Sequence, residues 1–349
     1  MDLFPGGKPA FYLFSILRPS MRTFLIKLFL ATFLPAILIT GFWWKFEGDI
    51  KIRADRGYNH SLDRALKIAK LLQTYPDSEV VFAGDSHAYS QLDPNIFRAE
   101  GISAVNVAMP GSDLLGFVSV MEELEMNLKK RIFVISMSQT QIDDDSLDTF
   151  SPEQYHALTP SERIAIFRAD WFRYAWSLGK DMNWTPDSFR RGILAATLLP
   201  LEMPSFGFEP VVNKTSVTCN VRWPSQARTA KLNGSRFRIV RQALDRLAQW
   251  PALTYIYNPP LHPSYRDCTA NSQAVAAEEQ FAKLMNLAVA EKERIRFVDL
   301  SQLPAAALPA ELYSDERQLT ADGARIFTQY WLDEIRKSGW LPQRTPSSN

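Results

Sequence analysis

Cysteine and histidine are scarce in this sequence. Of its 349 residues, 2 are cysteine and 4 are histidine. These numbers are too small for a four-thiolate zinc site, a disulfide-rich scaffold or a histidine-rich metal centre. We therefore expect no metal and no other cofactor. Cys219 and Cys268 are far apart in the sequence, so they either pair in an oxidising compartment or remain as two buried thiols.

A surplus of charge of either sign is also missing. Lysine and arginine together number 39, and aspartate and glutamate together number 38. A surface that binds nucleic acid usually carries a basic surplus, so we expect no nucleic-acid partner. Apolar residues make up 46% of the chain, which is enough to build a core and excludes a disordered chain. The length suits one large α/β domain with an insertion, or two small domains.

One long run has no charge. The segment Phe24–Trp44 contains 17 uncharged residues after Lys27, which is the lower limit for a helix that spans a membrane. Trp43 and Trp44 stand where an interfacial aromatic belt is expected. No small-residue cleavage pattern follows, so the run predicts a retained transmembrane anchor at 24–44. The alternative is a buried core helix.

The residues that flank this run suggest an orientation. Residues 1–23 are mostly basic among their charged positions and are interpreted as a short cytoplasmic N-terminus. Basic residues also follow the run, so the asymmetry is incomplete. We expect a single-pass protein of the inner (cytoplasmic) membrane, with residues 45–349 on the periplasmic or equivalent side.

Beyond the anchor, short apolar runs alternate with amphipathic stretches. Residues 45–77 are predicted to form a helical stalk, residues 78–338 the main domain, and residues 339–349 a tail. The predicted strands are Glu79–Ala83, Ala104–Val107, Arg131–Met137, Thr254–Asn258 and Ile295–Leu300. The predicted helices are Leu114–Lys130, Ala274–Lys292 and Ala321–Lys337. This alternation predicts an α/β fold with a doubly wound parallel sheet of about five strands.

The segment 143–235 interrupts the alternation of strands and helices. It is rich in aromatic residues and proline, and helical spacing returns only at Ser161–Leu178. We interpret it as a partly helical insertion. It is either a lid or partner surface, or an insertion without a function of its own.

The sharpest motif is Gly84-Asp85-Ser86-His87, directly after the first predicted strand. Ligands of open α/β sheets bind beyond the carboxyl ends of the strands. A serine on the tight turn at that edge is well placed for nucleophilic attack, and a glycine before it lets the chain turn.

Three blocks of the chain resemble the SGNH/GDSL hydrolase family. They are Gly84-Asp85-Ser86, Asn106–Gly111 after the second predicted strand, and Asp315–Thr328 before the last predicted helix. The resemblance covers residues 78–338 without the insertion. It implies a flavodoxin-like fold with Ser86 as the nucleophile. It further implies that Asp85 and Asn106 support the nucleophile turn, that the Gly111 amide helps to bind an oxyanion, and that Asp315 orients a catalytic histidine.

The chain departs from the family pattern at the catalytic histidine. Gln318 occupies the aligned position, and glutamine cannot take a proton from a serine hydroxyl. The family's third block is missing as well, and Gln139 in its place is a conceivable side-chain donor. His262, on the loop after the fourth predicted strand, is our first choice for the base. His87 is the second choice, because neighbouring side chains at a turn usually diverge.

The architecture resembles the membrane-anchored accessory proteins of O-acyltransferase systems for cell-envelope glycans. By this resemblance we expect acyl transfer, most simply acetyl transfer, to a cell-envelope polysaccharide, or hydrolysis of its esters. The expected partners are a membrane-bound O-acyltransferase, a glycan or acylated carrier, and the membrane. The alternative is a catalytically inactive scaffold that binds the glycan or the acyltransferase, because Gln318 replaces the histidine.

Overall fold

A computed structural model describes most of the chain beyond residue 65. The described residues are 66–124, 127–143, 157–162, 205–211, 232–269, 273–304 and 306–341, together with Arg64, Gln154 and several positions between 21 and 34. The chain divides into two units, Met1–Arg56 and Gly57–Asn349. The predicted anchor lies largely outside the described residues. Among the residues that are described, no helix combines the length and the apolar character needed to cross a membrane.

Five parallel strands form one sheet within the second unit. They are β1 (Val80–Ala83), β2 (Ala104–Asn106), β3 (Ile132–Ser136), β4 (Leu253–Asn258) and β5 (Ile295–Asp299). The strand order is β2-β1-β3-β4-β5, and every neighbouring pair is parallel. The predicted five-stranded parallel sheet is confirmed, and this order is the one found in flavodoxin-like folds.

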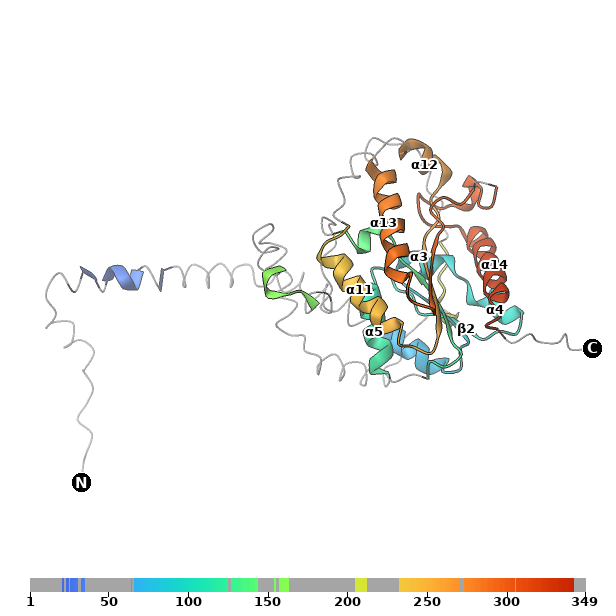
Figure 1. The fold of residues 1–349 in the computed structure, drawn as a ribbon, viewed down its shortest axis with the longest axis horizontal. Coiled ribbons are helices and arrows are strands. Elements are labelled where there is room, and N and C mark those ends of the chain that lie inside the picture. Colours follow the sequence, from blue (N-terminus) through green and yellow to red (C-terminus); the bar gives the residue numbers. More distant parts are fainter. Residues whose placement is uncertain are drawn as a thin grey trace, which may run out of the picture. The chain divides into compact units, whose positions relative to one another are not determined.

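Helices cover both faces of the sheet (Figure 1). They are α3 (Ser86–Gln91), α4 (Pro94–Ala99), α5 (Leu114–Glu123), α11 (Ser235–Leu247), α12 (Pro263–Thr269), α13 (Gln273–Val289) and α14 (Ala321–Lys337). Helices α5, α11 and α13 lie on one face, and α3, α4 and α14 pack on the other. Successive side chains of a strand point to opposite faces, so β1 contributes to the apolar cores on both faces of the sheet. Val81 and Ala83 join the first layer, and Val80 and Phe82 join the second.

The helices agree with the sequence prediction to different degrees. Helix α14 has the predicted bounds, and the Thr320 side chain caps it by accepting the Gly323 N–H. Helix α5 ends at Glu123 and not at Lys130. Lys130 has a φ of 62°, a left-handed conformation that no α-helix can contain. Helix α13 ends at Val289, before the predicted Lys292.

The predicted stalk contributes to the core. Residues 66–74 are helical, as expected from their apolar spacing. Ile68, Ala69, Leu71 and Leu72 are buried in the cluster that also holds the side chains of α5 and α11. This part of the stalk therefore belongs to the α/β unit and is stabilised by burial of its apolar face.

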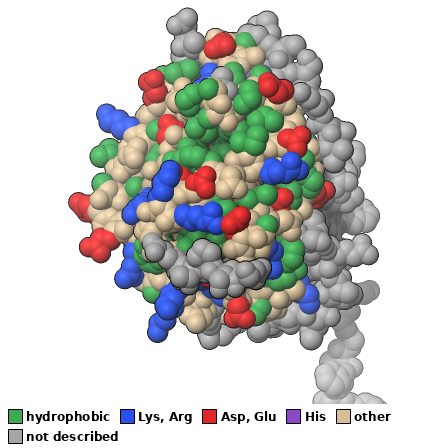
Figure 2. All heavy atoms as spheres, turned by 90° about the vertical axis from the view of Figure 1, so that its right-hand side faces the viewer, with side chains coloured by type: hydrophobic (Ala, Val, Ile, Leu, Met, Phe, Trp, Pro, Cys, Tyr) green, Lys and Arg blue, Asp and Glu red, His purple; other side chains and the backbone are tan. Residues whose placement is uncertain are grey.

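The surface carries charges of both signs. On the face shown in Figure 2, basic and acidic side chains are interspersed, as the balanced composition implies. On α14 several of them pair, as Arg336 does with Glu100 and Lys337 with Glu334. Solvent screens such exposed pairs, so they contribute little to stability and do not hold the fold together.

One of the two cysteines is in a disulfide. Cys268, on α12, is disulfide-bonded. The chain's other cysteine, Cys219, lies outside the described residues. Of the two alternatives that the sequence left open, the structure therefore has the paired form at Cys268.

Candidate active site

The turn after β1 is the centre of the candidate site. Gly84 has a φ of 116°, and a Cβ atom at this position would lie 2.3 Å from Ser136 Oγ. Only glycine permits this approach. The turn thus brings the carboxyl end of β1 against the carboxyl end of β3. The chain leaves β1 toward β2 on one side and β3 lies on the other, which makes this edge the topological switch point where ligands of such sheets bind.

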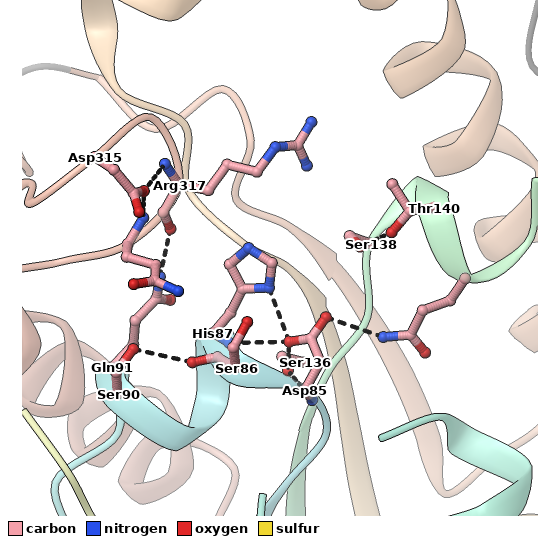
Figure 3. A network of polar contacts seen from close by, with 12 residues as sticks. Asp85, Ser86, His87, Ser90, Gln91, Ser136, Ser138, Thr140, Asp315 and Arg317 are labelled. Carbon is pink, nitrogen blue, oxygen red and sulfur yellow. Dashed lines mark hydrogen bonds and ion pairs between the residues drawn. The ribbon is translucent and has the colours of Figure 1, made fainter. Parts of the chain in front are cut away.

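The Asp85 carboxylate is the hub of this turn (Figure 3). Its Oδ1 accepts the His87 backbone N–H at 3.0 Å and the Ser136 hydroxyl at 2.8 Å, and it lies 2.8 Å from His87 Nδ1. Its Oδ2 accepts the Gln141 amide at 3.1 Å. In return, Ser136 Oγ accepts the Asp85 backbone N–H at 3.1 Å. The sequence-based role of Asp85 as a hydrogen-bonding support of the turn therefore fits these contacts.

These contacts keep Asp85 ionised although it is buried. Burial by itself raises the pKa of the Asp85 carboxyl, but the His87 imidazole and the hydrogen bonds from His87 and Ser136 hold that pKa below its ordinary value. The buried Tyr257 hydroxyl on β4 responds in the opposite sense. Its pKa is raised by burial and by the Asp85 charge, against a lowering effect of Ser136. A neutral phenol is thus within reach of the charge of an ionised carboxylate.

The contact with Asp85 determines which nitrogen of His87 is available. An ionised carboxylate only accepts hydrogen bonds, so the hydrogen of the neutral imidazole resides on Nδ1. Nε2 then carries the lone pair, and Figure 3 shows this second ring nitrogen pointing away from Asp85. The His87 side chain is only 11% exposed. A base that is fixed in one tautomer by a buried carboxylate is the arrangement that serine hydrolases use.

Ser86 stands next to this pair with an unengaged side chain. It is the first residue of α3, follows β1 directly and is half-buried. Within the described part of the chain, its Oγ forms no hydrogen bond, and Figure 3 draws none there. The hydroxyl can therefore engage a substrate without first breaking a bond to the protein.

The last block of the resemblance lies against α3 but does not complete a triad. The Gln91 side chain on α3 donates to the Arg317 carbonyl. Asp315 Oδ1 accepts the backbone N–H groups of Arg317 and Gln318 at 2.8 and 2.7 Å. The carboxylate of Asp315 thus shapes its own loop, which is the capping role that remains when no histidine occupies position 318.

His262 also lies beside this loop. Its backbone N–H donates to the Glu316 carbonyl at 3.0 Å, and its ring packs edge-on against Tyr313. Its Nδ1 accepts the Ser264 N–H at 3.0 Å, at the start of α12. In the neutral imidazole the hydrogen is therefore on Nε2. In this tautomer Nε2 donates a hydrogen bond and does not accept a proton. His262 as the base of Ser86 remains a prediction, and its present contacts are those of a helix cap.

Asn106 and Gly111 are placed at the same edge of the sheet. The Asn106 amide donates to the carbonyls of Ala88 and Leu92 at 2.7 and 2.8 Å, so it holds α3 and has no hydrogen left for an oxyanion. Gly111 has a φ of 71°, and its carbonyl accepts a hydrogen bond from Arg64. These contacts of Asn106 fit a support of the turn, and its functional role stays a prediction. The Gly111 amide as an oxyanion donor remains a prediction.

Neither a protein-family model nor a curated protein matches this chain. Among the described residues, no group of three His, Cys, Asp or Glu side chains could hold a metal ion.

Two residues that donate hydrogen bonds to Asp85 were not predicted from the sequence. Ser136 ends β3, and Gln141 follows in a short 3-10 turn, Gln139–Gln141. The sequence pointed to Gln139 as a donor, but the amide that reaches Asp85 belongs to Gln141. A signal did exist for Ser136. It closes the strand next to β1, and the carboxyl ends of neighbouring parallel strands meet at one edge.

The charge on Asp85 should make stability depend on pH. The folded-state pKa of Asp85 lies below the unfolded value of about 3.9. The contribution of ionised Asp85 to the free energy of unfolding is therefore complete above the unfolded pKa, and it disappears as the pH falls through the folded pKa. Asp85→Asn should lower the free energy of unfolding near neutral pH by about 3 kcal/mol, because a buried charged hub is lost. It should also flatten the fall in stability below about pH 4. Urea unfolding between about pH 3 and 7 measures both effects. Parallel pH curves for the two proteins would contradict this account.

Proposed function

We propose that this protein transfers an acyl group, most simply acetyl, to a cell-envelope polysaccharide or hydrolyses the corresponding ester. Ser86 is the nucleophile, and the His87–Asp85 pair is its base. The observation that carries the proposal is the 2.8 Å contact between His87 Nδ1 and the buried Asp85 carboxylate, one residue away from an unengaged serine hydroxyl. The resemblance to the SGNH/GDSL family supplies the reaction class, which rests on three blocks of sequence and not on the fold alone.

The chemistry follows from these groups. Ser86 Oγ attacks the ester carbonyl carbon, and its proton passes to His87 Nε2, directly or through one water molecule. Asp85 stabilises the imidazolium that forms. When the tetrahedral intermediate collapses, the leaving alcohol takes the proton from Nε2 and Ser86 carries the acyl group. A sugar hydroxyl or water, deprotonated by the same Nε2, then attacks the acyl carbon, and Nε2 returns the proton to Ser86 Oγ as the bond to Ser86 breaks. The backbone amides of Ser86 and Gly111 are proposed to bind the oxyanion.

The proposal places the domain outside the cytoplasm, anchored in the inner membrane by residues 24–44. The disulfide at Cys268 supports this placement, because disulfides persist in oxidising compartments. A membrane-bound O-acyltransferase is the proposed donor of the acyl group. A C-terminal reporter that is active only outside the cytoplasm tests the placement. Activity of that reporter inside the cytoplasm would contradict it.

A second candidate function is an inactive scaffold that binds the glycan or the acyltransferase. Two observations favour it. Gln318 stands where the family has its histidine, and the Asp315 carboxylate is used on backbone amides. In this alternative, the contacts of Asp85 and His87 only stabilise the turn.

Covalent labelling separates the two candidates. If Ser86 is active, the wild-type protein should react with a fluorophosphonate probe and cleave a chromogenic acetyl ester. Gln318→His should then change either reaction by less than about tenfold, because a base is already present. If the protein is a scaffold, the wild type should be inert, and Gln318→His should create esterase activity. A wild type that is inert in both assays would rule out the catalytic proposal.

A further inference from the structure

The helix that begins with Ser86 exposes only two side chains. Within α3, His87, Ala88, Ser90 and Gln91 are buried, whereas Ser86 and Tyr89 are half-buried. Residues three apart on a helix lie on the same face, with Cβ atoms about 5–6 Å apart. A molecule that reaches the Ser86 hydroxyl therefore meets the Tyr89 ring next.

A part of the insertion comes back to this face. Residues 205–211, here called the returning segment, contribute Glu209, whose carboxylate accepts a hydrogen bond from the Tyr89 hydroxyl. The Glu209 backbone N–H also donates to the Tyr89 carbonyl at 3.4 Å. Glu209 is itself exposed. An aromatic ring and an exposed carboxylate are thus joined beside the candidate nucleophile.

The returning segment is held there by specific packing. Phe206 has a φ of 57°, and its ring lies 3.7 Å from the Arg98 guanidinium and 5.1 Å from the Tyr75 ring. A Cβ atom on Gly207 would lie 1.8 Å from the Asn106 carbonyl oxygen, so the segment passes directly over the end of β2. Val211 then forms a bridge to Thr320, at the start of α14. A strained, close-packed backbone of this kind is found where a side chain must be held in a defined place.

The chemistry of the pair selects one kind of ligand. Burial and the Glu209 charge raise the pKa of the Tyr89 phenol, so it remains a donor to Glu209 at physiological pH. The ring offers an apolar surface to the C–H groups of a sugar, and the free lone pairs of the carboxylate accept sugar hydroxyl groups. A uronic acid or a phosphate would be repelled by Glu209.

We propose that Tyr89 and Glu209 form a binding subsite for an uncharged sugar residue of the glycan on which Ser86 acts. The inference rests on the proposed function for its location beside the nucleophile. It adds the class of glycan: neutral or N-acetylated, and not uronic acid or polyol phosphate.

Calorimetric titration of the full-length protein tests the subsite without any turnover. The probes are a neutral β-glucan hexasaccharide, an N-acetylglucosamine hexasaccharide and a uronic acid hexasaccharide. We expect at least one of the first two to bind and the uronic acid probe not to bind. Glu209→Gln should weaken binding by about tenfold or more, because it replaces a charged acceptor with a neutral amide. Tyr89→Phe, which keeps the ring, should weaken it less.

Glu100→Gln is the matched control. Glu100 is an exposed carboxylate that pairs with Arg336, and it precedes β2 at the opposite end of that strand. Binding should be unchanged in this variant. If neither neutral probe binds, or if Glu209→Gln binds like the wild type, the subsite is refuted. Fluorophosphonate labelling in the same preparation keeps the two proposals apart, since a labelled protein that binds no glycan loses only the subsite.

Discussion

Ser86→Ala is expected to lower the rate of acyl transfer or ester hydrolysis by about 10⁴-fold and to abolish fluorophosphonate labelling. The reason is that covalent catalysis needs the Oγ atom, and the other hydroxyl on the accessible face of α3, that of Tyr89, is hydrogen-bonded to Glu209. Steady-state kinetics with an acetyl ester, together with in-gel detection of the probe, measures the loss. The fold should survive, because Ser86 Oγ forms no hydrogen bond in the described part of the chain.

A serine outside the site provides the control for that experiment. Ser119 lies on α5, in the helical layer on the opposite face of the sheet from α3, where Arg246 approaches its hydroxyl at 3.5 Å. Ser119→Ala should keep both labelling and turnover. If Ser86→Ala retains the activity of the wild type, Ser86 is not the nucleophile.

The identity of the base gives the second large effect. His87→Gln should lower the rate by about 10³–10⁴-fold, because glutamine can still donate to Asp85 but cannot accept a proton. His262→Gln should lower the rate by less than about tenfold, while the lost acceptor for the Ser264 N–H costs about 1 kcal/mol of stability. Steady-state rates and thermal unfolding of both variants measure these effects.

The same pair of variants tests the sequence-based choice of base. If His262 takes the proton from Ser86, His262→Gln is the variant that loses activity and His87→Gln keeps most of it. That outcome would make His262, on the loop after β4, the base. Equal, small effects in both variants would mean that neither histidine is the base.

The sheet could be predicted from the sequence because its strands are buried on both faces. In β1, β3 and β4 every residue is buried, so each appears in the sequence as a continuous apolar run bounded by polar or turn residues. Helix α11 was missed, although Phe237, Val240, Leu244 and Leu247 follow helical spacing and are buried. The predicted insertion ended at residue 235, and no element was assigned between it and β4.

The candidate site was less accessible to sequence reasoning. The position of Ser86 followed from the motif and the preceding strand. The pairing of His87 with Asp85 did not, since it depends on how the first turn of α3 orients two side chains. Glu209 carried no signal at all. It reaches Tyr89 from a distant part of the chain only because Gly207 can pass over Asn106. Contacts of this kind depend on how two distant segments pack, and neither segment has a sequence motif or periodicity that predicts the contact.

The strand order also has a consequence for the order of folding. Strands β1, β2 and β3 and the contact between Asp85 and Ser136 all lie within residues 80–136. The partner of β3 on its other side is β4, which is more than a hundred residues further along the chain. On the ribosome, the turn that carries Ser86 can therefore form while one edge of β3 is still open. Closing so long a loop is slow, although doubling its length adds only about 0.6 kcal/mol to its entropic cost. The nascent chain thus exposes an apolar edge strand until β4 emerges, and this interval is when it most needs a chaperone.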